Sequence, residues 1–411
     1  MNQQPYGLPP RWWEPKLTPS IVKLSRGLRN RTLRHEQQLI RIRAQGVEHL
    51  ERSLAAGYGV LITPNHSAHY DWAALYSVAD QIRQPLYFLT AWQVFATSNW
   101  FHRWLMQRIG CFSIDRENSD HQAYRKATQI LREEPHPLVV FPEGDIYHIN
   151  DRTTPFHEGA ASIALGAARR ASRPIVMLPC AIKFWYIDDP GKQMERSMAR
   201  LEQHLHLGQP SNMSLLDRIY RLAQSVMAIK ELKYAGRVGS GTFRQRTTQL
   251  MEHILNRLEA EHSLDAIAAP TPVRVQRLRR LLTANMGCTQ NAESTTRRVR
   301  QLEDLFFVIQ LFSYPDNYLG KHPTIERLAE TMDKLEEDIL TKPLPSIRGR
   351  RRAVIQFGEP IRVGQHMKRN SHVRNLTKKL QRNVQSLLDE MNETKHHCAV
   401  AGKSLKSLPE A

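Results

Sequence analysis

The stretch Gly59-Val60-Leu61-Ile62-Thr63-Pro64-Asn65-His66-Ser67-Ala68-His69-Tyr70-Asp71 decides the fold, because an apolar run leads at once into a turn and a helix start. The run before Pro64 is typical of a buried strand, and Pro64 itself indicates a turn. His66 and Asp71 are five residues apart, about 140° around a continuous helix. They can pair only if His66 lies in the turn and Asp71 on the helix after it. In that arrangement Asp71 would hold one ring nitrogen, and the other could accept a proton from a hydroxyl group.

Two further apolar runs end in side chains suited to binding or catalysis. One is Leu138-Val139-Val140-Phe141-Pro142-Glu143-Gly144, and the other is Gly110-Cys111-Phe112-Ser113-Ile114-Asp115-Arg116. In open α/β sheets, ligands collect at the carboxyl ends of the strands. The three strand ends therefore predict a single cleft.

In their order along the chain these blocks resemble the glycerolipid acyltransferase family typified by lysophosphatidic acid acyltransferases. That family has an NHxxxxD block, a strand ending in arginine, an FPEG block and a later apolar strand ending in proline, here Ile175 to Pro179. The resemblance covers about residues 40 to 190 and a short piece near 353 to 362. It implies a glycerol-3-phosphate acyltransferase-like fold. It also implies transfer of a fatty acyl group from acyl-CoA or acyl carrier protein to a lipid hydroxyl, with a lysophospholipid, 1-acylglycerol 3-phosphate, as the expected acceptor.

The resemblance also implies a role for each matching residue. His66 would be the general base and Asp71 its orienting partner, so that no metal, cofactor or covalent nucleophile is required. Glu143 would position the acceptor at a turn where Gly144 lets backbone approach the ligand. Arg116 would bind the acceptor's phosphate through charge-assisted hydrogen bonds.

One departure from the family pattern concerns the phosphate. The family continues FPEG with Thr-Arg, whereas Asp145 and Ile146 follow Gly144 here. Arg152 could supply the missing arginine from the next turn, since Pro155 to Ala160 still resembles the family's continuation. Otherwise the acceptor is a lipid hydroxyl without a phosphate.

Composition favours a protein of a reducing compartment with an anionic partner. With 58 Lys and Arg against 40 Asp and Glu, the formal net charge is +18, which suits a polyanion or an anionic membrane surface. The four cysteines show no CxxC spacing. The N-terminus lacks a signal-peptide pattern, and the best uncharged window, Leu86 to His102, is too polar to cross a bilayer. We therefore expect a peripheral protein on the cytoplasmic face of a membrane, without a transmembrane helix.

The apolar runs alternate with helical stretches from about residue 40, which predicts a mostly parallel mixed sheet flanked by helices. The alternation stops after Gly191, and Ala353 to Ile361 returns to strand character. A large helical insertion explains this pattern, with a separate C-terminal domain as the alternative. The expected divisions are an N-terminal amphipathic helical segment (1–40), an α/β core (41–190), a helical insertion (191–343), a closing strand with a C-terminal helix (344–394) and a disordered tail (395–411).

Two apolar segments allow either a membrane contact or core packing. Thr18 and Pro19 indicate the start of a basic amphipathic helix, which with the preceding Tyr6, Trp12 and Trp13 forms a candidate interfacial anchor. Its alternative is a helix packed on the core. The aromatic-rich stretch Leu86 to Gly110 could likewise fill the core, line an acyl groove or enter lipid.

Two other function classes fit parts of the sequence. His66, His69 and Asp71 could be the ligands of a metal-dependent hydrolase, but the further His and Asp residues expected downstream are missing. The basic composition also fits nucleic-acid binding, but no zinc-finger or RRM signature accompanies it. We therefore expect no metal and no nucleic-acid partner.

Overall fold

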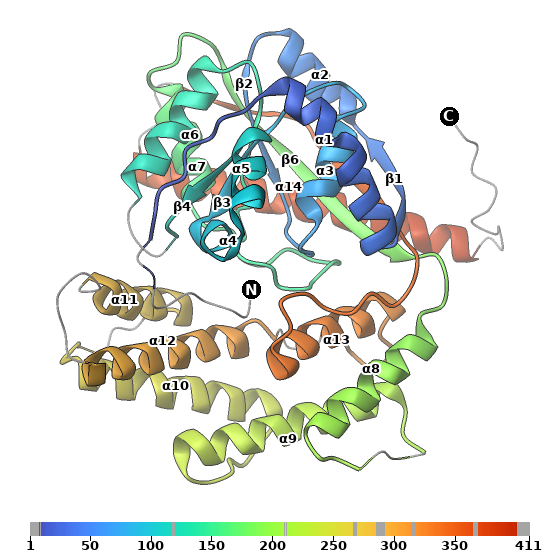
Figure 1. The fold of residues 1–411 in the computed structure, drawn as a ribbon, viewed down its shortest axis with the longest axis vertical. Helices are drawn as coiled ribbons and strands as arrows, with labels where there is room; N and C mark the ends of the chain where they lie inside the picture. Colours follow the sequence, from blue (N-terminus) through green and yellow to red (C-terminus); the bar gives the residue numbers. More distant parts are fainter. Residues whose placement is uncertain are drawn as a thin grey trace. The chain divides into compact units, whose positions relative to one another are not determined.

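The computed structural model describes residues 8, 10–116, 120–208, 210, 212–265, 269–284, 292–314, 318–364 and 369–400. The chain forms two compact units (Figure 1). One is an α/β unit that contains Arg11–Arg116, Asp120–Pro190 and the chain from Ile347 onward. The other is a helical unit built on Gly191–Ser346.

The α/β unit is a mostly parallel mixed sheet of eight strands with helices on both faces, which confirms the predicted fold class. Its strand order is β1-β7-β6-β2-β5-β3-β4, and β8 pairs with β6. Only β7 and β8 run antiparallel to β6. Its strands are β1 (Leu39–Gln45), β2 (Gly59–Pro64), β3 (Tyr87–Ala91), β4 (Cys111–Ile114), β5 (Leu138–Val139), β6 (Ile175–Tyr186), β7 (Arg351–Phe357) and β8 (Ile361–Val363). Its helices are α1 (Pro19–Arg31), a π-helical turn (Thr32–Glu36), α2 (Val47–Ala55), α3 (Asp71–Ala79), α4 (Trp92–Thr97), α5 (Trp100–Arg108), α6 (His121–Glu133), α7 (Gly159–Ala168) and α14 (Arg369–Val400).

The core lies on both faces of the central strands. All six residues of β2 are buried, as expected for a strand covered on each side. Alternate residues face opposite ways: Val60 and Ile62 pack with residues of α1, α2 and α3, whereas Leu61 packs with residues of α6, α7 and α14. Cys111 and Cys180 are buried residues of β4 and β6.

The helical unit interrupts the chain between two paired strands. Tyr186 at the end of β6 pairs with Arg351 at the start of β7, and Ile187 N donates to Arg350 O at 2.8 Å. The chain therefore leaves the sheet and returns to it at one place. In between lie α8 (Gly191–His204), α9 (Leu215–Ala235), α10 (Phe243–Glu261), α11 (Thr271–Ala284), α12 (Ala292–Phe312) and α13 (Ile325–Leu340).

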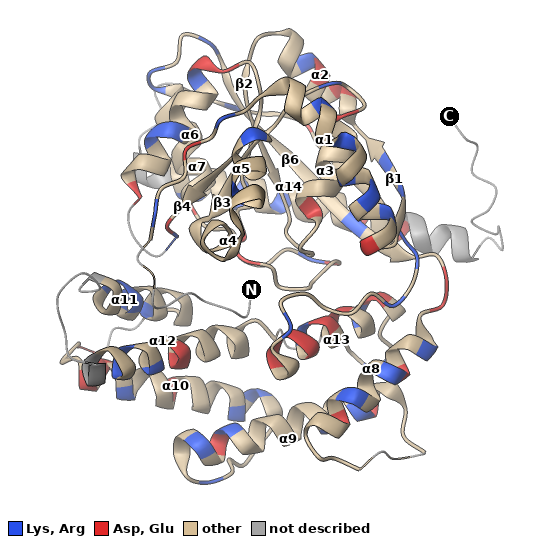
Figure 2. Cartoon of the chain, viewed as in Figure 1, with Lys and Arg blue, Asp and Glu red and all other residues tan. Residues whose placement is uncertain are grey.

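The helical unit has its own small core and many ion pairs. Leu250, Ile254 and Leu258 of α10 pack with residues of α11 and α12. Buried arginines join neighbouring helices, for example Arg274 to Glu259 at 2.7 Å. Lys, Arg, Asp and Glu occur along these helices (Figure 2).

The N-terminal stretch differs from the expected separate segment over residues 1–40. From Arg11 on it is part of the α/β unit, because Trp13 N donates to Ser113 Oγ at 2.8 Å and Ser113 N donates to Trp13 O at 3.1 Å. The Trp13 ring stacks on Phe95, with centroids 5.3 Å apart, and Trp12 contacts Phe112 edge-on. The two tryptophans thus pack on the domain. Tyr6 lies outside the described residues.

Two other sequence-based boundaries also shift. The closing strand expected over 353–361 is broken into β7 and β8 between Gly358 and Pro360. The last helix, α14, continues to Val400, into the tail that was expected to be disordered, and residues 401–411 lie outside the described part of the chain. Within the described residues, every helix is too short or too polar to reach across a bilayer.

Candidate active site

The turn after β2 is fixed by an asparagine that continues the sheet. Pro64 is the last residue of β2 to pair with β6. Beyond it, the Asn65 side chain donates to Ile182 O at 3.0 Å and accepts from Ile182 N at 2.7 Å. A buried amide thus replaces a strand residue beside β6, satisfying two backbone groups that would otherwise be unpaired. The next residue, His66, leaves the sheet at a defined point.

His66 and Asp71 pair across this turn as the sequence predicts. His66 Nδ1 lies 2.9 Å from Asp71 Oδ2, and Asp71 is the first residue of α3. The same Oδ2 accepts from the backbone N–H groups of Ser67 at 2.8 Å and Ala68 at 2.9 Å. Asp71 is fully buried, whereas 18% of the His66 side chain is exposed. A carboxylate at Asp71 places the ring proton on Nδ1 and leaves the Nε2 lone pair of a neutral imidazole available.

The surroundings of the pair restrict the imidazole ring and keep the nearest cysteine neutral. The His66 ring stacks on Phe141 with centroids 4.2 Å apart, which restricts its rotation. Cys180, on β6, is fully buried. Burial raises the pKa of its thiol, and the nearby Asp71 charge raises this pKa further. Cys180 is therefore a neutral thiol and a poor nucleophile.

Glu143 ties the FPEG turn to His66. Its Oε1 accepts from the His66 backbone N–H at 2.8 Å. Its Oε2 accepts from Thr154 N at 3.0 Å and from the Thr154 hydroxyl. The carboxyl group is only 2% exposed, and burial raises its pKa to about 7 despite these hydrogen bonds. Both carboxyl oxygens of Glu143 thus bind other parts of the chain, and these contacts fix the turn that contains His66.

Gly144, beside Glu143, is required by the local backbone. Its φ is +77°, and a Cβ there would lie 2.8 Å from His157 Cδ2. His157 N donates to Pro142 O at 2.8 Å, which closes the turn. Burial lowers the pKa of His157, and the positive charge of Arg116 lowers it further. Arg116, half-buried two residues beyond β4, therefore lies on the Gly144 side of the site.

The loop after Gly144 is held by β6 and α14. Asn150 pairs with Phe184 of β6 as Asn65 does with Ile182, donating to Phe184 O at 2.6 Å and accepting from its N at 2.8 Å. Thr153 N donates to Gln385 Oε1 of α14 at 2.8 Å. Arg152, expected to approach the phosphate, lies between these two anchored positions and is half-buried.

The structure brings together His66, Asp71, Glu143 and Gly144, and places the charge of Arg116 near them. His69 is a ligand in the metal-hydrolase alternative. The centroid of its ring lies 5.6 Å from that of the His148 ring. Sequence reasoning missed Thr154, Asn150 and Gln385. Their partners are 11, 34 and 232 residues away, and no local pattern marks them.

Comparison with known families agrees with this geometry. Residues 41–183 match the family model described as Acyltransferase. The match covers β2, the histidine turn, the FPEG turn and most of β6. No curated protein matches the chain. The α/β unit thus contains an acyltransferase domain, and the protein is an acyltransferase enzyme.

Proposed function

We propose that the protein is an O-acyltransferase that moves a fatty acyl group from acyl-CoA or acyl carrier protein to the hydroxyl of 1-acyl-sn-glycerol 3-phosphate. The observation that carries this proposal is the His66–Asp71 pair, at 2.9 Å, at the end of β2. The match to the acyltransferase model supports acyl transfer to a lipid. Donor, acceptor and residue roles are the parts that we propose.

His66 is the base in this mechanism. Its Nδ1–H donates to Asp71, so Nε2 can take the proton of the acceptor hydroxyl as the oxygen attacks the thioester carbonyl. Collapse of the tetrahedral intermediate breaks the carbon–sulfur bond, and the imidazolium returns the proton to the leaving thiolate. Asp71 stabilises the imidazolium between these steps and keeps the tautomer fixed. The acyl group passes directly from sulfur to oxygen.

Glu143 positions the base. Its carboxyl group holds the His66 backbone through Oε1 and the far side of the loop, at Thr154, through Oε2. A base must lie within hydrogen-bond reach of the proton that it removes, so a fixed turn favours transfer.

Arg116 is the proposed partner of the acceptor's phosphate. It lies on the Gly144 side of the site, where its charge acts on His157. A planar guanidinium can bind two phosphate oxygens at once. Arg152, in the loop after Gly144, is a second candidate. An acceptor without a phosphate remains the alternative, and it would make Arg116 dispensable.

We further propose that the enzyme works at an anionic membrane surface. The chain carries a formal charge of +18. Two exposed apolar regions of the α/β unit could meet lipid: Leu24 and Leu28 on α1, and an aromatic group on α5. Basic residues occur along α1 (Figure 2).

The test is acyl transfer with a labelled donor and mass identification of the product. The purified protein is given oleoyl-CoA or oleoyl-acyl carrier protein with lysophosphatidic acid, or with monoacylglycerol as a matched acceptor without phosphate. We expect phosphatidic acid as the product. His66→Ala should lower the rate by about 10² to 10⁴, whereas His121→Ala, at an exposed histidine of α6, should leave it unchanged. Near-normal turnover in His66→Ala would contradict the mechanism.

The acceptor assignment is tested by Arg116→Ala. The KM for lysophosphatidic acid should rise by about ten-fold or more, as for a lost charge-assisted hydrogen bond, while the KM for the donor stays constant. Arg116→Lys should recover part of the loss, because an ammonium group keeps the charge but cannot bind two phosphate oxygens as the planar guanidinium does. Equal use of monoacylglycerol, or an unchanged KM, would remove lysophosphatidic acid as the acceptor and leave acyl transfer to a lipid hydroxyl.

A further inference from the structure

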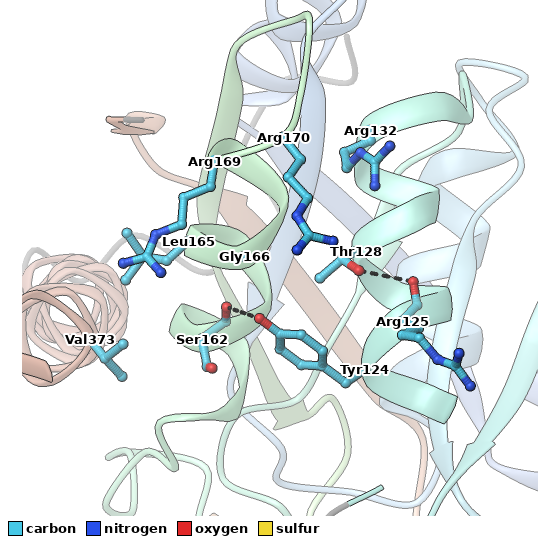
Figure 3. Close-up of a pocket in the computed structure, with 10 residues that line it drawn as sticks. All are labelled: Tyr124, Arg125, Thr128, Arg132, Ser162, Leu165, Gly166, Arg169, Arg170 and Val373. Carbon is cyan, nitrogen blue, oxygen red and sulfur yellow. Dashed lines mark hydrogen bonds between the residues drawn. The ribbon is translucent and has the colours of Figure 1, made fainter. Parts of the chain in front are cut away.

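A cavity of about 240 Å³ lies between α6 and α7 (Figure 3). Its walls come from these two helices, from the two residues after α7 and from one residue of α14. The lining residues are Tyr124, Arg125, Thr128, Arg132, Ser162, Leu165, Gly166, Arg169, Arg170 and Val373. The catalytic proposal uses none of them.

The cavity is strongly cationic. Arg125, Arg132, Arg169 and Arg170 line it, and none of its ten lining residues is acidic. The Arg170 side chain reaches into the space between the two helices, toward Thr128 (Figure 3). Arg132 donates to Glu133 at 3.0 Å, but its Nε is buried and has no hydrogen-bond partner within the described residues. Cations gathered in one hollow repel one another, and a bound anion would relieve this repulsion.

The walls of the cavity are fixed by close helix packing. A Cβ at Gly166 would lie 2.0 Å from Tyr124 Oη, so only glycine lets this ring lie across α7. Tyr124 Oη donates to Ser162 O at 3.2 Å, and Thr128 Oγ1 donates to Arg125 O at 2.9 Å. The hollow is thus formed before any ligand arrives, which lowers the entropy lost on binding.

The cavity is separate from the His66 site. α6 and α7 both end just before strands begin, at β5 and β6, whereas His66 follows the end of β2. In a parallel sheet the starts and the ends of the strands lie on opposite sides. A six-residue strand such as β2 separates them by about 20 Å. The arginine-rich end of the cavity, at Arg132, Arg169 and Arg170, therefore lies near the starts of the strands, whereas His66 lies near their ends.

We propose that this cavity is a second anion site, which binds a phosphate group of a small ligand or lipid headgroup. A guanidinium group can bind two phosphate oxygens at once. The volume is below the range of about 300 to 1,000 Å³ typical of pockets for larger ligands, so a phosphate or diphosphate is the unit that it fits. This site does not depend on the proposed acyl transfer.

The test measures binding and location in the full-length protein. Pyrophosphate is titrated by calorimetry, and hydrogen–deuterium exchange is followed with and without it. We expect slower exchange in peptides of α6 and α7. Arg170→Gln should weaken binding about ten-fold or more, and Arg170→Lys should restore part of it. Arg382→Gln removes an equal charge from an exposed position on α14 outside the cavity and should behave as wild type.

The proposal is overturned if neither pyrophosphate nor phosphatidic acid binds at millimolar concentration, if protection appears elsewhere than α6 and α7, or if Arg382→Gln loses as much binding as Arg170→Gln. Arg116→Gln should keep the protection of α6 and α7, which separates this site from the proposed acceptor site. The ligand source is distinguished by soluble dihexanoyl phosphatidic acid, with dihexanoyl phosphatidylcholine as the zwitterionic control. Binding of both pyrophosphate and phosphatidic acid, or of either alone, supports a phosphate site and identifies its source. Equal binding of phosphatidylcholine overturns it.

Discussion

At the scale of single residues, Asp71 holds the His66 ring and the turn around it. One carboxylate oxygen accepts from His66 Nδ1 and from two backbone N–H groups, so Asp71 fixes both the ring and the turn. An asparagine oxygen could keep all three contacts, but a neutral amide holds the ring proton on Nδ1 less strongly than a carboxylate does and stabilises the imidazolium less.

Asp71→Asn should therefore keep the fold and lose activity. We expect kcat to fall by about 10² to 10⁴ with little change in KM, because the wrong tautomer places a proton on Nε2. Steady-state kinetics beside thermal unfolding measures both effects. A variant that unfolds at the wild-type temperature and retains its kcat would show that the charge of Asp71 is not needed for catalysis.

Glu143 gives stability a defined pH dependence. Its pKa is raised from 4.5 to about 7 by burial. Between these values the folded protein keeps a proton that the unfolded chain has lost, so stability falls as pH rises. The loss is complete above about pH 7 and amounts to roughly 3 kcal/mol.

Glu143→Gln should remove this slope. The free energy of unfolding of both proteins is measured in urea between pH 4.5 and 8. As pH rises, the wild type should lose stability relative to the variant. The variant also loses an acceptor for Thr154, which adds a constant offset to the comparison. Parallel stability curves would mean that Glu143 is already ionised at low pH.

At the scale of elements, α1 is attached to the α/β unit by a buried arginine. Its inward residues are Val22, Ser25 and Arg29. Arg29 makes a two-pronged ion pair with Asp80, at 2.8 Å for each contact, and lies 4.4 Å from the centre of the Tyr76 ring. Leu24 and Leu28 point outward instead, at 84% and 53% exposure. The helix is therefore packed on the core and also presents apolar residues to its surroundings.

Arg29→Ala should lower the free energy of unfolding by about 3 to 5 kcal/mol, because it leaves Asp80 buried without its partner. Arg26→Ala, at an exposed position of the same helix, is the matched control and should change stability by less than about 0.5 kcal/mol. Chemical unfolding measures both variants. Equal stability of the two would mean that α1 does not depend on this ion pair.

The second exposed apolar element is α5, which has no buried residue. Trp100, Phe101 and Trp104 are 74%, 44% and 41% exposed and contact one another through their rings. Arg108 lies 5.9 Å from the centre of the Trp104 ring. Exposed aromatics beside cations are typical of a surface that enters the lipid headgroup region. In contrast, Trp92 and Phe95 of α4 are buried, so the aromatic-rich stretch contributes both to the core and to the exposed surface.

Replacing Trp100 and Phe101 by serine should weaken binding to anionic vesicles by about ten-fold or more. The wild type transfers these two large apolar side chains from water into the lipid on binding, and the variant does not. Vesicle sedimentation measures the affinity. Phe243→Ser, at an exposed aromatic of the helical unit, serves as the control. If the double variant binds vesicles as wild type does, lipid contact belongs to another surface.

At the scale of the whole molecule, the strand after the helical unit completes the centre of the sheet. β7 lies between β1 and β6, and Ile355 is fully buried between Ala44 and Ile182. Without β7, β1 would have no partner in the described sheet. The catalytic unit thus needs residues that come more than 150 positions after β6.

Ile355→Pro should unfold the α/β unit, because proline removes a ladder hydrogen bond and fixes φ near −65° in a central strand, at a cost of about 3 kcal/mol or more. Ile355→Val, the conservative control, should lose only about 0.5 to 1.5 kcal/mol. Circular dichroism and acyl-transfer activity report the outcome. A chain ending at Pro190 that remained folded and fully active would contradict the central role of β7.

The sequence by itself determined the features that depend on neighbours along the chain. The apolar run of β2, Pro64 and the five-residue offset from His66 to Asp71 are sufficient to predict a strand, a turn and a His–Asp pair. Helices α6 and α10 each begin after a capping residue, Asp120 and Thr242, whose side chain accepts from backbone N–H groups of the first turn. Each of these features rests on contacts within a few residues, where spacing and side-chain type decide the geometry.

Only the tertiary structure decided the contacts between distant segments. Asn65 pairs with Ile182, 117 positions away, and Glu143 reaches His66 across 77 positions. β1 was not recognisable as a strand of this sheet, since its partner β7 follows the helical unit. From the sequence, Trp12 and Trp13 could contact either lipid or the core, and only the tertiary structure packs both beside β4. A local pattern shows that a polar or aromatic side chain needs a partner, but which partner is near depends on how the whole sheet closes.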